Sequence, residues 1–306
     1  MEKEAVRHSP EKLVKANGIQ INYDTFGSPL GAPLLLIAGL GMQMTGWDEQ
    51  LCQLLAAQGY WVIRFDNRDV GLSTHLNQAG VPDIAKLFGG EPVEVPYKLI
   101  DLAQDAVGLL DALRIEKAHV VGVSLGGMIA QTIAIHFPER VQTLTSIMST
   151  TGDPKLPPPK PQAMMILFTP APVERHAYLD YQVKVWRTLG GPKFPLDEGH
   201  VRQRAERTLA RGLNPAGFAR QLAAVLSSGS RKEALKTVQA PTLVIHGDAD
   251  PLIPLEGGLD TAETIPEARL EIVEGMGHEL PPQIWPWLVE KISEHANPDA
   301  NNGSSQ

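Results

Sequence analysis

Short apolar runs alternate with helical repeats along most of the chain, and this alternation constrains the fold more than any other feature. The patterns predict strands at residues 32–38, 60–66, 119–123, 141–148, 242–246 and 270–273, and helices at 47–58, 102–113, 125–137 and 282–294. Units of this kind join parallel neighbours through right-handed crossovers. We therefore predict an α/β fold with a mostly parallel twisted sheet and helices on both faces.

Two segments depart from the alternation. Residues 13–23 contain Asn17-Gly18 between two short runs, a pattern typical of an antiparallel hairpin. From residue 151 to about 231 the strand pattern stops: seven prolines fall between Pro154 and Pro172, and helical patterns follow. Because long connections in compact domains are usually functional, we predict an inserted helical cap, with an ordinary surface connection as the alternative.

The predicted organisation is a core formed by residues 1–150 and 232–296, a cap at 151–231 and a disordered polar tail at 297–306. The net charge of -8, without a dense basic cluster, argues against nucleic acid as a partner. Cys52 is the single cysteine, so an internal disulfide is excluded. No apolar run indicates a secretory signal or a membrane span. We expect a soluble, cytoplasmic protein.

The segment GVSLGG at residues 122–127 carries the strongest chemical signal. It follows a predicted strand and precedes a predicted helix, which is the context that a G-x-S-x-G nucleophile turn requires. Gly122 and Gly126 permit a sharp turn, while Ser124 projects its hydroxyl above the sheet. The helix that begins there directs free N–H groups toward a developing anion.

A serine hydroxyl needs a base and a group that orients the base. His278 follows the strand predicted at 270–273, and Asp248 and Asp250 follow the strand at 242–246, where active sites of parallel sheets gather. Asp153, after the preceding strand, is a third candidate acid. The order along the chain is serine, aspartate, histidine.

These segments together resemble the α/β-hydrolase fold family. The resemblance rests on GVSLGG, on HGDAD at 246–250 and on GMGH at 275–278, and it covers nearly the whole chain. The stretch RFDNRDVGLS at 64–73 resembles the D-x-R-x-x-G-x-S segment of the branch that contains esterases, haloperoxidases and aclacinomycin methylesterase. The resemblance implies Asp250 as the triad acid, with Asp248 and Asp153 as alternatives.

The same resemblance implies an oxyanion hole. One donor is the backbone N–H of Leu125, and the other is the N–H of Leu40, in the loop after the strand at 32–38. Ala38 stands where the family usually has a histidine that steadies this loop. We hypothesise that Gly41 packing and Asp66 or Arg68, from the neighbouring strand end, hold the loop instead.

The glycines of LLLIAGLGM at 34–42 also suggest a dinucleotide-binding turn. Asp66 ends the next strand as that motif requires, but the third glycine of G-x-G-x-x-G would fall on Met44. No two histidines have metal-ligand spacing. We therefore expect neither a cofactor nor a metal.

The prediction is a serine carboxylic-ester hydrolase that acts on small or medium apolar esters through an acyl-enzyme on Ser124. Cap residues predicted to contact the small-molecule ester are Met164, Met165, Phe168 and Trp186, although they could equally hold the cap to the core. Alternatives with the same triad are a cofactor-free perhydrolase or haloperoxidase and a carbon–carbon bond hydrolase. A non-enzymatic ligand receptor is a further alternative.

Overall fold

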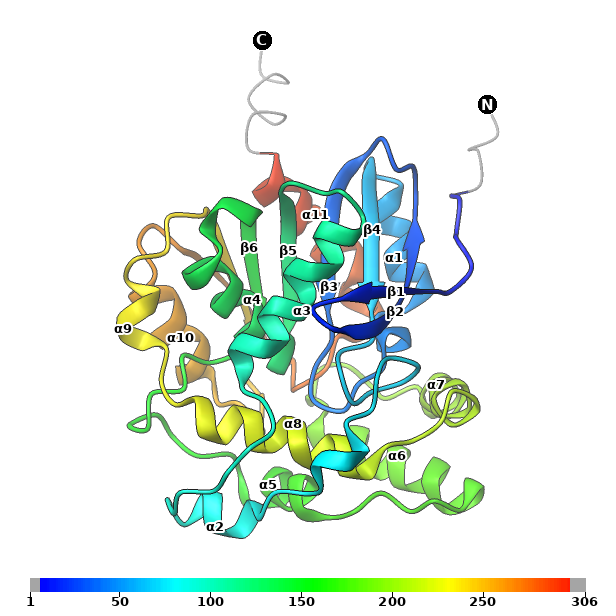
Figure 1. The fold of residues 1–306 in the computed structure, drawn as a ribbon, viewed down its shortest axis with the longest axis vertical. Coiled ribbons are helices and arrows are strands. Elements are labelled where there is room, and N and C mark those ends of the chain that lie inside the picture. Colours follow the sequence, from blue (N-terminus) through cyan, green and yellow to red (C-terminus); the bar gives the residue numbers. More distant parts are fainter. Residues whose placement is uncertain (1–5, 298–306) are drawn as a thin grey trace.

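The computed structural model describes residues 6–297, which form one twisted sheet of eight strands in the order β1-β2-β4-β3-β5-β6-β7-β8 (Figure 1). All but the first of the residues predicted as a disordered tail lie outside this range. The strands β1 and β2, and β2 and β4, pair antiparallel, and all other neighbours pair parallel. The bounds are β1 (Lys12–Ala16), β2 (Ile19–Phe26), β3 (Ala32–Ile37), β4 (Tyr60–Phe65), β5 (Ala118–Val123), β6 (Val141–Ile147), β7 (Thr242–Gly247) and β8 (Arg269–Val273).

Helices cover both faces of the sheet. The helices are α1 (Glu49–Ala56), α2 (Ile84–Phe88), α3 (Leu99–Ala112), α4 (Leu125–His136), α5 (Pro161–Phe168), α6 (Arg175–Leu189), α7 (Glu198–Ala210), α8 (Pro215–Ser228), α9 (Lys232–Leu235), α10 (Leu255–Thr264) and α11 (Trp285–Ala296). Four single turns of 3-10 helix are η1 (Met44–Gly46), η2 (Asn77–Ala79), η3 (Pro138–Arg140) and η4 (Pro282–Ile284). Within the described part of the chain, every helix is too short or too polar to cross a bilayer.

The alternation of side chains along β3 explains its unbroken apolar sequence. Leu35 and Ile37 pack with α3 and α4, on the near side of the sheet in Figure 1, and Leu34 and Leu36 pack with α1 and α11 on the other side. A strand that is buried on both faces needs apolar residues at every position. The predicted α/β fold, with its mostly parallel sheet, is confirmed.

The hairpin at the start of the chain also forms as predicted. Asn17 and Gly18 adopt φ angles of 45° and 80°, the left-handed conformations that a two-residue turn between antiparallel strands requires. In contrast, the helices α2 and α10 were not expected from the sequence patterns. The helix α2 has only five residues, and α10 buries small or polar residues such as Gly257, Gly258 and Thr261, so neither shows an apolar repeat.

The segment between β6 and β7 contains α5 to α9 and no strand. Figure 1 shows α8 lying across the lower ends of the strands, with α5 and α6 below it and α7 at the right. The loops that follow β3 and β4 both contact α8: Gly41 faces Phe218, and Asp69 pairs with Arg220. The helix α8 therefore lies at the carboxyl ends of the parallel strands.

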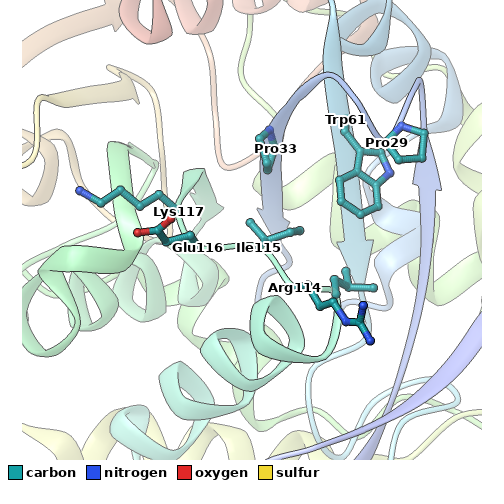
Figure 2. Close-up of a pocket in the computed structure, with 8 residues that line it drawn as sticks. Pro29, Pro33, Trp61, Arg114, Ile115, Glu116 and Lys117 are labelled. Carbon is teal, nitrogen blue, oxygen red and sulfur yellow. The ribbon is translucent and has the colours of Figure 1, made fainter.

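The amino ends of the strands border a shallow hollow (Figure 2). It is lined by Pro33 at the start of β3, by Trp61 near the start of β4 and by residues 114–117 after α3. This hollow lies at the end of the sheet opposite to that of α8.

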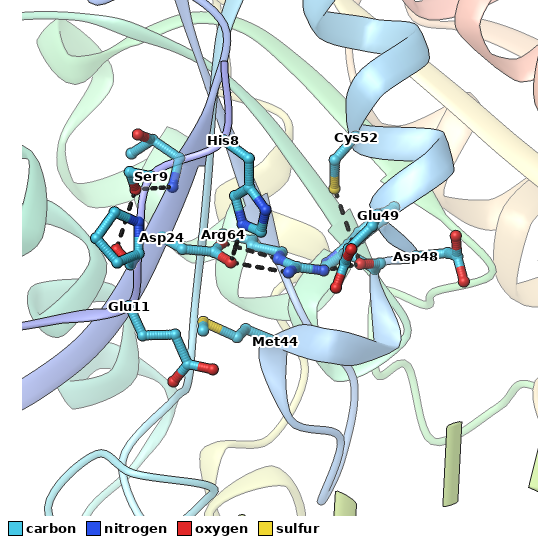
Figure 3. A network of polar contacts seen from close by, with 12 residues as sticks. His8, Ser9, Glu11, Asp24, Met44, Asp48, Glu49, Cys52 and Arg64 are labelled. Atoms are coloured by element: carbon cyan, nitrogen blue, oxygen red, sulfur yellow. Dashed lines mark hydrogen bonds and ion pairs between the residues drawn. The ribbon is translucent and has the colours of Figure 1, made fainter. Parts of the chain in front are cut away.

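A buried ion pair joins β2 to β4 (Figure 3). The guanidinium of Arg64 donates two hydrogen bonds of 2.8 Å to the Asp24 carboxylate, and both side chains are 2% exposed. His8 bonds the same carboxylate at 2.8 Å and stacks on Phe26. Burial raises the pKa of the nearby Cys52 thiol to about 12, so this cysteine stays protonated and unreactive at neutral pH.

Stability should depend on the protonation of His119, which is buried in β5 and bonds Thr143 at 2.9 Å. Burial lowers its pKa to about 4, compared with about 6.5 in an unfolded chain. Between these pH values the unfolded chain binds more protons, so the free energy of unfolding should rise with pH. In His119→Val we expect that rise to be shallower, by up to about 1.4 kcal/mol per pH unit.

Urea unfolding between pH 4 and 6.5 checks this expectation. The control is His136→Gln, at an exposed position on α4, which should keep the slope of the unchanged protein. Equal slopes for all three proteins would show that His119 does not bind a proton on unfolding.

Candidate active site

The backbone turns sharply at Ser124, between β5 and α4. Ser124 has a φ angle of 56°, which is unusual for a residue other than glycine. A Cβ atom on Gly122 would lie 2.0 Å from the carbonyl oxygen of Gly126, and one on Gly126 would lie 2.1 Å from that of Ile37. The glycines of GVSLGG are therefore required by close backbone packing.

The turn is fixed from a neighbouring strand. The N–H of Ser124 donates to the carbonyl of Ile147 at 2.9 Å, and the Ser149 hydroxyl donates to the carbonyl of Ser124 at 2.9 Å. Both partners lie at the end of β6 or just beyond it. The strained turn thus holds the Ser124 hydroxyl at the carboxyl edge of the sheet.

Three of the predicted residues meet at this edge. His278 Nε2 lies 3.0 Å from Ser124 Oγ, and His278 Nδ1 lies 2.7 Å from Asp250 Oδ2. Asp250 is 3% exposed and His278 is 7% exposed, so water has little access to the hydrogen bond between them. The geometry is that of a nucleophile, a base and an orienting carboxylate.

Asp250 is oriented by its own loop. Its Oδ1 atom accepts hydrogen bonds from the N–H groups of Leu252 and Ile253, at 2.8 and 2.9 Å, which leaves Oδ2 for His278. His246 contacts this loop through Nε2, which lies 2.8 Å from the Ile253 carbonyl. Burial lowers the pKa of His246, so its imidazole is neutral and packs beneath the loop.

The two alternative carboxylates have other partners. Asp248 accepts a 2.6 Å hydrogen bond from the N–H of Gly275 and so holds the loop that carries His278. Asp153 pairs with Lys232 at 3.0 Å. Asp250 is the carboxylate of the three that contacts His278.

The backbone segments that contain the two expected oxyanion donors both approach the nucleophile. Leu125 is the first residue of α4, directly after Ser124. The loop that contains Leu40 passes close to the serine, because a Cβ atom on Gly39 would lie 3.5 Å from Ser124 Cβ and 4.0 Å from its Oγ. The backbone of this loop therefore borders the position where a substrate carbonyl would be attacked.

The supports of this loop include two of those hypothesised. Gly41 adopts a φ of 64° and packs against Phe218, and Asp66 accepts a 2.7 Å hydrogen bond from the N–H of Met44. Both contacts agree with the hypothesis. Of the two alternatives, Asp66 therefore contacts the loop, whereas the guanidinium of Arg68 pairs with Asp105 of α3.

Gln221 of α8 supports the loop and was not singled out from the sequence. Its Oε1 accepts a hydrogen bond from the N–H of Gly41 at 2.8 Å, and its Nε2 donates to the carbonyl of Arg68 at 2.9 Å. A glutamine within a helical segment belongs to no motif. Its role is visible only in the folded structure, where the side chain is buried and bonds both loops.

The four cap residues predicted to contact substrate lie in different surroundings. Met165 and Phe168 of α5 are 66% and 47% exposed, and Phe168 packs against Phe88 of α2. Met164 is half-buried on the same helix. The ring centroid of Trp186, in α6, lies 4.2 Å from the guanidinium carbon of Arg204, which stacks over the ring. The four residues thus differ in exposure and in the side chains that they contact.

Within residues 6–297, no group of three or more His, Cys, Asp or Glu side chains is arranged to hold a metal ion.

Comparisons with known proteins agree with the observed fold. A family model described as alpha/beta hydrolase fold matches residues 32–282. Rhodomycin D methylesterase from Streptomyces sp. is 32% identical, over 94% of this chain and 98% of that protein. The 2-hydroxymuconate semialdehyde hydrolase of Pseudomonas sp. is 30% identical, over 90% of each chain. A solved meta-cleavage product hydrolase from Pseudomonas fluorescens has the same fold, with a TM-score of 0.74 and 23% identity over 94% of this chain and 97% of that chain.

The contact between Asp250 and His278 predicts how the reactivity of Ser124 depends on each carboxylate. Asp250→Asn should slow phosphonylation of Ser124 by a fluorophosphonate at least about a hundredfold, because the imidazole loses its orienting anion. Asp248→Asn and Asp153→Asn should react at close to the original rate. Mass spectrometry of the labelled peptide measures the rate. A large loss in Asp248→Asn or Asp153→Asn, with normal labelling of Asp250→Asn, would contradict the assignment.

Proposed function

This chain belongs to the α/β-hydrolase fold family, and we propose that it is a serine carboxylic-ester hydrolase that forms an acyl-enzyme on Ser124. The observation that carries the proposal is the continuous hydrogen-bonded chain from Ser124 through His278 to Asp250. Such a chain lets a serine act as a nucleophile at neutral pH.

In the proposed reaction, Ser124 Oγ attacks the ester carbonyl while His278 Nε2 takes the hydroxyl proton. The N–H groups of Leu40 and Leu125 donate to the oxyanion of the tetrahedral intermediate. His278 then gives its proton to the departing alkoxide, which leaves the acyl group on Ser124. A water molecule, activated by the same imidazole, releases the acid and restores the serine. Asp250 holds the imidazole tautomer and stabilises its cation.

The cap, residues 151–231, is proposed to cover the substrate. The support is its place after β6, with α8 over the carboxyl ends of the strands (Figure 1). Half-buried Met164 and Trp186 offer apolar surface for a small or medium ester, and Met165 and Phe168 would have to turn inward to contribute. The methylesterase among the relatives makes methyl esters the first substrates to test.

A carbon–carbon bond hydrolase is the second candidate. The semialdehyde hydrolase relative, at 30% identity over 90% of the chain, favours it. An ester series and a 2-hydroxy-6-oxodienoate, compared by kcat/KM, separate the two activities. A higher value for the dienoate would assign the chain to the second class.

We also propose that the protein is cytoplasmic and that its partner is a small molecule. A cytoplasmic location is supported by the single, buried cysteine, which forms no disulfide within the chain. The net charge of -8 favours a small-molecule partner over a nucleic acid.

Substitution of the nucleophile tests the mechanism. Ser124→Ala should lower kcat for a short-chain p-nitrophenyl ester on the order of 10,000-fold or more, because the acyl acceptor is removed. Ser28→Ala, at an exposed loop position, serves as the control and should keep the original kcat. Near-normal turnover by folded Ser124→Ala would overturn the proposal.

A further inference from the structure

We propose that Gln221 is a positioning residue that fixes the Leu40 N–H as an oxyanion donor, and that α8 is therefore part of the catalytic framework. The inference rests on the proposed function, because it assumes that an oxyanion forms beside Ser124. Gln221 lies in the segment between β6 and β7, and it gives the Leu40 loop a polar support that Ala38 cannot give.

The Leu40 N–H is part of a closed turn, and its direction depends on the position of that turn. Met42 N–H donates to the carbonyl of Gly39 at 3.1 Å, so residues 39–42 form a four-residue turn with Leu40 and Gly41 at its centre. The Leu40 N–H belongs to the peptide between Gly39 and Leu40, whose carbonyl accepts this hydrogen bond, so the N–H keeps its direction as long as the turn keeps its position. The hydrogen bond from Gly41 N–H to Gln221 Oε1, at 2.8 Å, ties this turn to α8 and so fixes its position.

The orientation of the Gln221 amide is itself fixed. Its Nε2 donates to the carbonyl of Arg68 at 2.9 Å, and the side chain is fully buried. A flipped amide would place its oxygen against a carbonyl and its NH₂ against an N–H group, so both contacts would become repulsive. The bridge therefore permits one arrangement of the loop after β3 relative to the loop after β4.

The helix α8 is anchored firmly enough to act as a support. Arg220 donates hydrogen bonds of 2.8 and 2.7 Å to the Asp69 carboxylate, and both side chains are fully buried. Burial alone would raise the pKa of Asp69, but the hydrogen bonds that it accepts, first from Arg220, bring the pKa below its usual value. Asn214, before the first turn of α8, donates to the carbonyl of Asp69 at 3.0 Å.

Gln221 and Phe218 lie one turn apart on α8 and approach the same glycine. A Cβ atom on Gly41 would lie 2.5 Å from the Phe218 ring, so the aromatic side chain closes the space beside the amide bridge. Residues three apart share a helix face, and this face of α8 is directed at the Leu40 loop. If α8 moved away, the loop would lose both contacts.

The loop also has a second link to this segment. Gln43 Nε2 donates to the carbonyl of Thr208, in the last turn of α7, at 3.1 Å and to that of Gly212, in the connection to α8, at 2.7 Å. Gln43 lies beyond the turn, whereas Gln221 binds its central peptide. The effect on the oxyanion is therefore assigned to Gln221.

The test variant is Gln221→Met, which keeps the length of the side chain but removes its acceptor and its donor. We expect kcat for a p-nitrophenyl ester to fall about 10- to 100-fold, less than for loss of a donor itself, with KM changed little. Affinity for an alkyl boronic acid, whose tetrahedral adduct forms on Ser124, should fall by the same factor as kcat/KM. Affinity for the product carboxylic acid should stay constant.

The matched control is Gln131→Met, in α4. Gln131 is also fully buried and bonded through both amide atoms, to Ser146 at 3.2 Å and to Arg231 at 3.1 Å, but it has no contact with the Leu40 loop. It should lower the urea midpoint while leaving kcat and boronate affinity unchanged. If Gln221→Met does not fold, Gln221→Asn replaces it, since the shorter amide cannot span both partners.

The outcomes separate the two proposals. Normal kcat and boronate affinity in a folded Gln221 variant, or losses equal to those of Gln131→Met, would overturn the positioning role while Ser124→Ala remains inactive. Undiminished turnover by Ser124→Ala would overturn the proposed function, and the positioning role with it. Parallel losses of kcat/KM and boronate affinity, seen at Gln221 alone, would support the inference.

Discussion

The site depends on the steric constraint at Ser124. A left-handed serine between a buried strand and a buried helix costs on the order of 1–3 kcal/mol, and such a conformation persists only where the surroundings determine it fully. Gly122 and Gly126 allow the backbone segments to approach, and the Ile147 carbonyl binds the serine N–H. Because β5 lies between β3 and β6, the same turn places Ser124 beside the Gly39 loop.

Buried charges in the loop after β4 hold together the loops and helices at the carboxyl ends of the parallel strands. Asp66 binds the N–H groups of Met44 and Leu72 and pairs with Arg211, and Asp69 pairs with Arg220. These arginines come from the segment between β6 and β7. Breaking a buried pair by removing one partner typically costs about 3–5 kcal/mol, because a charge is left without compensation. The acidic residues after β4 thus fix that segment over the site.

The proposed reaction and the proposed role of Gln221 have the same physical basis. An oxyanion is stabilised by donors that are already oriented before charge develops, and reorientation during the reaction would cost part of that stabilisation. Leu125 is oriented by the first turn of α4. Leu40 lies in a loop that needs external support, and with Ala38 at its start the polar support comes from Asn67, Asp66 and Gln221.

The sequence by itself determined the parts of the protein that depend on local rules. Short apolar runs specified central strands such as β3 and β5, Asn17-Gly18 specified the hairpin, and GVSLGG specified the turn at Ser124, because each acts through nearby residues. Tertiary structure decided which carboxylate reaches His278, that Arg68 pairs with Asp105, and that Gln221 bridges two loops. These contacts join residues from 28 to 180 positions apart, and such separations become short distances only when the sheet and its helices have packed.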